Sequence, residues 1–171
     1  MMFRNAPPLS RRALLASAAG AALAPLARAA GSDAPELRAA PASVRLAPPE
    51  YPETAIWAYD GAAPGPEIRV ARGERVRRTL VNALDMPTTI HWHGVRLPNA
   101  MDGVPGLTQP AVEPGGRFLY DFAAPDPGTY WYHPHVRSWE QVARGLSGAL
   151  IVEEDAPPEV DRDVTLVLDD W

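Results

Sequence analysis

The sequence predicts an all-β domain, either a β-sandwich or a Greek-key β-barrel, from three observations. Twenty prolines in 171 residues argue against a helical bundle, because proline breaks helix interiors. Short apolar and β-branched runs recur between residues 55 and 152, separated by turns that contain Gly and Pro. None of these runs has the repeat of an amphipathic helix, and only residues 138–144 fit a short helical turn.

Residues 1–29 are expected to be an export signal that is removed from the mature protein. An Ala- and Leu-rich run over 13–27 follows Arg11 and Arg12, and Ala27-Arg28-Ala29 fits a small-residue cleavage site. The run is too short to span a bilayer. The stretch Ser10-Arg11-Arg12-Ala13-Leu14-Leu15 resembles a twin-arginine signal, which implies a periplasmic or secreted protein.

The rest of the chain divides into three expected parts. Residues 30–50 are rich in Ala, Pro and Glu and read as a flexible lead-in, and residues 51–155 form the β domain. Residues 156–171 read as a linker followed by one further strand at 164–168. Within the domain the expected strands, in order, are 55–59, 68–70, 76–81, 88–92, 118–122, 129–132 and 146–152.

Composition excludes several classes of function. All 16 basic residues are Arg, and four of them fall in residues 1–30, which leaves 12 against 21 acidic residues and a net charge of −9. Such an acidic body does not suit a nucleic-acid-binding protein. These 171 residues hold no Cys, which excludes disulfides, iron–sulfur clusters, thiolate-bound zinc or copper, and a thiol nucleophile within them.

The four histidines of the chain form two H-x-H pairs, His91 with His93 and His133 with His135. In a strand, residues i and i+2 lie on one face, so the members of each pair project together. Neutral imidazole is a good ligand for Zn, Cu, Fe and Ni. The spacing predicts a metal site, but it leaves open whether four histidines hold one ion or each pair bridges two. Asp102 lies in the loop after the first pair and is the nearest acidic candidate for supporting such a site.

These residues resemble the copper motifs of the multicopper oxidases, in particular the bacterial laccase-like and cuprous-oxidase-like members. The first motif is His91-Trp92-His93-Gly94 with Asp102-Gly103 after it. The second is Tyr130-Trp131-Tyr132-His133-Pro134-His135, followed by the Gly- and Leu-containing run at 145–152. Further upstream, residues 60–74 resemble the opening strands of the family, so the likeness covers roughly residues 50–171.

The resemblance implies a cupredoxin (plastocyanin-like) domain and a set of roles for its residues. In the family, eight histidines hold a trinuclear copper cluster between the first and last domains, and O2 is reduced there to water. By resemblance, His91 binds the type 2 copper, His93 and His133 bind one type 3 copper, and His135 binds the other. Asp102 matches an acid that helps to deliver protons.

The sequence also departs from the family pattern. It lacks the late H-C-H motif whose Cys binds the type 1 copper in the family. That copper accepts electrons from the donor, a phenol or a low-valent metal ion. We therefore expect an N-terminal piece of a longer oxidase, inactive alone, whose partner is a C-terminal cupredoxin domain. The residues also leave open a stand-alone, non-catalytic copper-binding protein. A copper-free relative is disfavoured because all four histidines are present.

Overall fold

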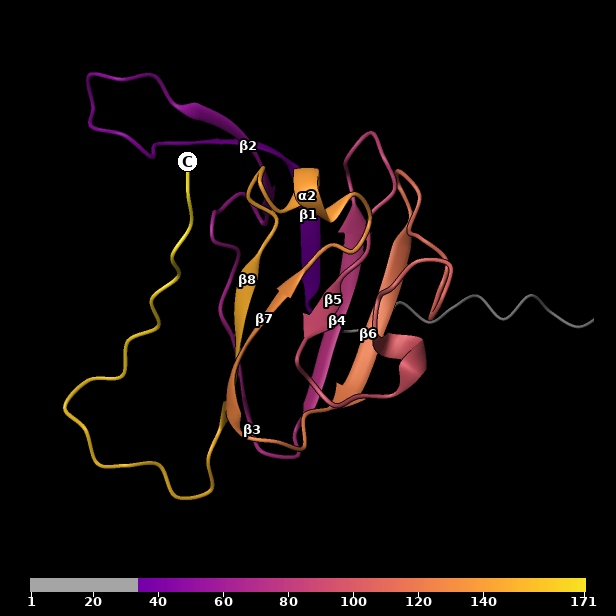
Figure 1. Ribbon diagram of the computed structural model, residues 1–171, viewed down its shortest axis with the longest axis vertical. Coiled ribbons are helices and arrows are strands. Elements are labelled where there is room, and N and C mark those ends of the chain that lie inside the picture. Colours follow the sequence, from indigo (N-terminus) through magenta and orange to yellow (C-terminus); the bar gives the residue numbers. More distant parts are fainter. Residues whose placement is uncertain (1–33) are drawn as a thin grey trace, which may run out of the picture. The chain divides into compact units, whose positions relative to one another are not determined.

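The computed structural model describes residues 34–171, and the signal predicted for residues 1–29 lies outside them. Eight strands form two four-stranded sheets that pack face to face (Figure 1). The first sheet has the order β2-β1-β4-β6 and the second the order β3-β8-β7-β5. The strands are β1 (Glu36–Val44), β2 (Thr54–Tyr59), β3 (Ile68–Ala71), β4 (Arg75–Asn82), β5 (His91–His93), β6 (Arg117–Ala123), β7 (Gly128–His133) and β8 (Gly148–Glu153).

The predicted all-β class is confirmed, and the helical content is small. A 3₁₀ turn, η1 (Asn99–Met101), lies in the long loop after β5, and one helical turn, α2 (Ser138–Gln141), lies between β7 and β8. The helical turn falls within the predicted 138–144 segment. Among the described residues, no helix has the length and apolar character needed to cross a membrane.

The core between the sheets is aromatic. Trp92 is fully buried, and its ring lies 5.1 to 5.6 Å, between centroids, from those of Tyr120, Phe122 and Tyr132. Trp92 faces inward from β5, so its two neighbours in sequence face outward, as expected for side chains that alternate along a strand. The core therefore fixes which face of β5 the two histidines occupy.

The flexible lead-in expected over residues 30–50 is wrong for residues 36–44, which form β1 in the interior of the first sheet. Leu37 and Ala39 point into the core, but the small side chain of Ala and the presence of Pro41 conceal this alternation in the sequence. β1 pairs in parallel with β4 only over Glu36–Ala39, so Pro41 follows this pairing, where its missing N–H costs no bond to β4.

The strand predicted at residues 164–168 does not form, since residues 154–171 contain no strand pairing. Leu166 and Leu168 are 79% and 89% exposed. The alternating pattern suits a strand, yet a strand needs a neighbour for its backbone hydrogen bonds, and these residues have none among residues 34–171. The segment is fixed instead by side chains, because Asp163 accepts a hydrogen bond from Arg69 of β3 at 2.9 Å. Whether it opens a further domain stays a prediction.

Candidate metal centre

The two histidine pairs meet where β5 and β7 run side by side (Figure 1). The strands are antiparallel, with His91 directly opposite His133 and His93 opposite Trp131. Residues that are directly opposite in a sheet share a face, so three imidazoles project together from the outer side of the second sheet. The sequence predicted the common face within the first pair, and the strand register adds His133 to it.

All four imidazoles gather at this place. The ring centroid of His91 lies 5.5 Å from that of His93, 5.4 Å from that of His133 and 5.1 Å from that of His135. One nitrogen from each of His91, His93 and His133 lies within 4.8 Å of the others, which is close enough for a shared ion. His135 is outside this group of three, and its ring is closer to that of His91 than to that of His133, where the centroids are 6.2 Å apart.

In His91 and His133, main-chain oxygens determine which ring nitrogen is left free to bind a metal. His91 Nδ1 lies 2.8 Å from the carbonyl oxygen of Asp102, and His133 Nδ1 lies 2.8 Å from that of Pro134. A carbonyl oxygen only accepts, so both Nδ1 atoms carry the hydrogen and both Nε2 atoms keep a lone pair. His133 Nε2 faces His93 Nδ1 at 3.2 Å. This donor set fits a transition-metal ion that prefers imidazole.

His133 is held in the form that can bind a metal. Its side chain is buried, and this burial lowers its pKa from 6.5 to about 4, against the opposing effect of its hydrogen bond to Pro134. The neighbouring imidazoles of His91, His93 and His135 lower the pKa further. The ring is therefore neutral near pH 7, and no proton has to be displaced from Nε2 before it binds an ion.

The structure shows supporting residues that the sequence analysis missed. Trp131 stacks on His133 with centroids 4.0 Å apart, and on His93 at 5.1 Å. Its place two residues before His133 was the available signal, because it puts both side chains on one face. Thr89 Oγ1 accepts a hydrogen bond from the main-chain N–H of His135 at 3.1 Å. No sequence pattern indicates that contact.

Asp102 lies beside the site as predicted, but it contacts His91 mainly through its backbone. Its carboxylate oxygen Oδ1 is 3.4 Å from His91 Nδ1, farther than its main-chain oxygen. The carboxylate is 29% exposed, so it contacts both solvent and the histidine cluster.

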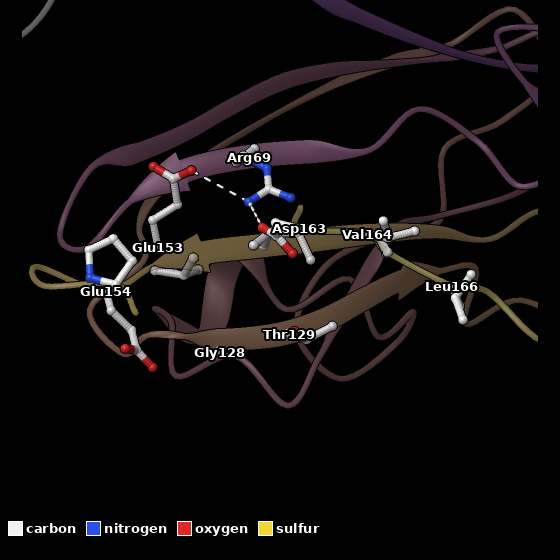
Figure 2. A pocket seen from close by; sticks show the side chains of 12 residues that line it. Arg69, Gly128, Thr129, Glu153, Glu154, Asp163, Val164 and Leu166 are labelled. Carbon is white, nitrogen blue, oxygen red and sulfur yellow. Dashed lines mark hydrogen bonds and ion pairs between the residues drawn. The ribbon is translucent and has the colours of Figure 1, made fainter. Parts of the chain in front are cut away.

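A separate hollow of about 400 Å³ lies between β3, β7, β8 and residues 163–166. Figure 2 shows Arg69 reaching both Glu153 and Asp163 within it, at 3.5 and 2.9 Å. The guanidinium also contacts Glu67 at 3.0 Å. These charges are paired with one another, no histidine lines the hollow, and residues 163–166 of the C-terminal segment form part of its wall.

Comparison with known proteins identifies the family. The family model described as multicopper oxidase matches residues 42–157, which is more than half of the chain. This chain belongs to the multicopper oxidases. The predicted resemblance is therefore confirmed, and the described residues are an N-terminal multicopper-oxidase domain with a cluster formed by His91, His93 and His133. Copper is the metal that the family and the imidazole ligands both support.

Relatives of this multicopper-oxidase domain include copper-resistance proteins. Copper resistance protein A of Pseudomonas syringae pv. tomato is 45% identical over 116 residues, which is 67% of this chain and 19% of that protein. Multicopper oxidase MmcO of Mycobacterium tuberculosis is 41% identical over 124 residues, covering 70% of this chain and 23% of that protein. The chain thus spans about a fifth of the length of these relatives, which contain further domains.

Solved structures agree with the fold. Lac15 from a marine microbial metagenome superposes with a TM-score of 0.71 at 51% identity, over 74% of this chain and 34% of that one. A multicopper oxidase from Pseudomonas thermotolerans gives 0.67 at 51% identity, over 71% of this chain and 29% of that one. The predicted cupredoxin-like sandwich is therefore confirmed for this multicopper-oxidase domain.

Proposed function

We propose that this domain contributes four histidines to a trinuclear copper cluster that reduces O2 to water in a longer, exported oxidase. The observation that carries the proposal is the gathering of all four imidazoles on one side of the second sheet, with centroids 5.1 to 5.5 Å from that of His91. Three of them offer nitrogens close enough for shared binding, and His135 extends the group toward a second ion.

In this assignment His91 binds the type 2 copper, His93 and His133 bind one type 3 copper, and His135 binds the other. His135 is not one of the three residues whose ligand nitrogens lie within 4.8 Å of one another, which supports a different ion for His135 from that bound by His93 and His133. Copper so bound would supply electrons to O2, and this chain holds the ligands in place. The electron donor is proposed to be a phenol or a low-valent metal ion, oxidised at a site in a C-terminal cupredoxin domain.

Asp102 is proposed to supply protons. Its carboxylate lies 3.4 Å from His91 Nδ1 and remains partly exposed, so it can take a proton from solvent and hold it beside the cluster. A carboxylate in this position can exchange protons repeatedly without being a copper ligand. Asp102 also anchors His91 through its main-chain oxygen, which substitution of the side chain leaves in place.

The location of the oxidase is also a proposal. The Arg pair and the Ala-rich run of residues 1–29 support twin-arginine export to the periplasm or the medium. Mass spectrometry of protein from its native host tests this, with a mature start near Ala30 expected. Mature molecules that mostly retain a peptide across Ala29 and Ala30 would contradict it.

The central experiment measures copper content and oxygen uptake of the 171-residue chain, alone and with a C-terminal partner that carries four further histidines and the Cys. Alone, the chain should bind copper weakly and consume no oxygen catalytically, because its copper ions lack half of their ligands. With the partner, tight binding and uptake with a phenolic donor should both appear. Sustained catalytic uptake by the chain alone overturns the proposal.

Variants of the assembled oxidase sharpen the assignment. His93→Ala should abolish oxygen uptake, whereas Asp102→Asn should slow uptake and leave copper bound. Tyr51→Ala changes a 57% exposed residue outside the cluster and serves as the control, with no expected effect. Loss of copper from Asp102→Asn would make the carboxylate a ligand and contradict its role in proton delivery.

A further inference from the structure

The loop after β5 packs directly against the backbone of β5 itself, and one glycine makes this contact possible. Gly103 is buried and has a φ of +76°. A Cβ atom at this position would lie 1.8 Å from the carbonyl oxygen of Ile90 and 2.9 Å from the main-chain nitrogen of His91. Both atoms belong to backbone, which cannot rotate away as a side chain can. Any larger residue must therefore push the loop off the strand.

This close packing brings a main-chain acceptor to a histidine ring. The carbonyl oxygen of Asp102, next to Gly103, lies 2.8 Å from His91 Nδ1. A carbonyl cannot donate, so the hydrogen of the neutral imidazole stays on Nδ1 and Nε2 keeps its lone pair. The tautomer of His91 is thereby fixed by the position of the loop backbone.

The carboxylate of Asp102 is the weaker of the two candidate acceptors. It lies 3.4 Å from His91 Nδ1, beyond the usual length of an N–H···O hydrogen bond, and it is partly exposed to solvent. The loop backbone is itself restrained, since Thr108 Oγ1 accepts from the main-chain N–H of Val104 at 2.9 Å and donates to the Val104 carbonyl at 3.1 Å.

We propose that Gly103 is a positioning residue for His91: by letting the loop touch β5, it holds the Asp102 carbonyl on Nδ1 and keeps Nε2 directed to bind metal. The proposed effect on the tautomer concerns the metal-free chain and does not depend on copper binding. Only its consequence for copper rests on the function proposed above. Outer partners of metal-binding histidines are typically worth about 10- to 100-fold in metal affinity.

The test compares two glycines of the same loop. Gly103 and Gly106 both have a φ of +76°, but a Cβ at Gly106 meets nothing within 4 Å. Alanine therefore brings the same backbone strain to both positions and a collision only at Gly103. Nitrogen-15 NMR of the metal-free chain, at a pH where the ring is neutral, reads the tautomer of His91, and a separate titration measures Cu(II) affinity.

Gly103→Ala should move His91 toward the Nε2–H tautomer and weaken Cu(II) binding by about tenfold or more, as for other outer partners. Gly106→Ala should leave both unchanged. Asp102→Asn, which keeps the main-chain oxygen, should also retain the Nδ1–H form. The proposal is overturned if Gly103→Ala keeps the wild-type tautomer, or if Asp102→Asn changes it.

Two further results would still allow the role of Gly103 to be decided. If the unsubstituted chain binds no copper at all, the proposed function fails, yet the tautomer measurement still decides the role of Gly103. If Gly103→Ala does not fold, Thr108→Val weakens the same loop at another point. It removes the two hydrogen bonds of Thr108 Oγ1 to the main chain of Val104 and, of the bonds between these two residues, leaves only the one from the Thr108 N–H to the Val104 carbonyl. It should then cause a smaller shift of His91 in the same direction, and an unchanged tautomer there overturns the proposal.

Discussion

The two H-x-H pairs have the same spacing in the sequence but are held by different parts of the fold. His91 and His93 both lie within β5, so the alternation of a strand directs them to one face. His133 is the last residue of β7, whereas His135 follows the strand and owes its place to a hydrogen bond from its N–H to Thr89. The same motif is thus built by strand geometry in one pair and by a side-chain contact in the other.

The members of each pair also differ in burial. His93 and His135 are exposed, whereas His133 is buried among the other imidazoles and beneath the stacked ring of Trp131. The buried member is neutral and fixed, and the exposed members can meet ligands from a neighbouring domain. Equal spacing in the sequence therefore does not imply equal roles. Single substitutions should show which histidine contributes most to copper binding.

The largest difference is expected between His133→Ala and His135→Ala. His133 contacts all three other imidazoles, so its removal should lower Cu(II) affinity by more than about 100-fold, beyond the effect of outer partners. His135→Ala should cost less in the isolated chain, because the group formed by His91, His93 and His133 remains. Competition titration with a Cu(II) chelator measures both, and equal losses would show that the two members of this pair contribute equally.

A smaller effect is expected from Thr89→Val, which removes the acceptor for the His135 N–H. The hydrogen bond is only partly buried, so its loss should cost about 1 kcal/mol of folding free energy, at the low end of the range for buried donors. Copper affinity should also fall, because His135 loses its anchor. The matched control is Thr88→Val, which breaks a buried 2.6 Å hydrogen bond to Gln141 and touches no histidine. Thermal unfolding should detect both changes, while copper binding should change only for Thr89→Val.

A further prediction concerns the pH dependence of stability and isolates His133. Its folded pKa of about 4 lies below that of the free side chain, so between pH 6.5 and 4 the unfolded chain binds a proton that the folded chain does not. The stability of the metal-free chain should therefore decrease as the pH falls through this window. His133→Asn removes this part of the decrease. Urea unfolding at pH 7 and pH 4.5 compares the two chains, and identical pH dependence would contradict the low pKa.

Sequence reasoning succeeded where local periodicity carries the information. The alternation around Trp92 predicted the shared face of His91 and His93, and the apolar run at 146–152 predicted β8. β1 was missed because Ala and Pro41 conceal its pattern and its partners, β2 and β4, lie elsewhere in the chain. The predicted strand at 164–168 had the pattern but lacks a neighbouring strand in the described part of the chain, and no local signal in the sequence reveals this.

The same distinction applies to the metal site. The four candidate ligands and Asp102 were predicted from motifs, whose residues lie close together in the sequence. The contacts that support them join distant segments: Thr89 and His135 are 46 positions apart, and Gly103 touches Ile90 across a loop. Such contacts depend on loop conformation and strand register, which follow from the whole fold. Trp131 lies between these two cases. Its position two residues before His133 predicted that the two side chains share a face, but the sequence did not predict that the rings stack.

The parallel pairing of β3 with β8 has a consequence for how this domain forms. Ile68 pairs with Leu150, so the second sheet closes only after nearly the whole domain has been synthesised. Pairings between distant segments slow folding, because the intervening chain must be ordered before the contact is made. β7, which carries His133, lies between β8 and β5 and gains both neighbours only at that late stage. A nascent chain that lacks β8 could therefore pair β5 with β7, which sets His91 opposite His133, but it would lack the strand that joins this pair to β3.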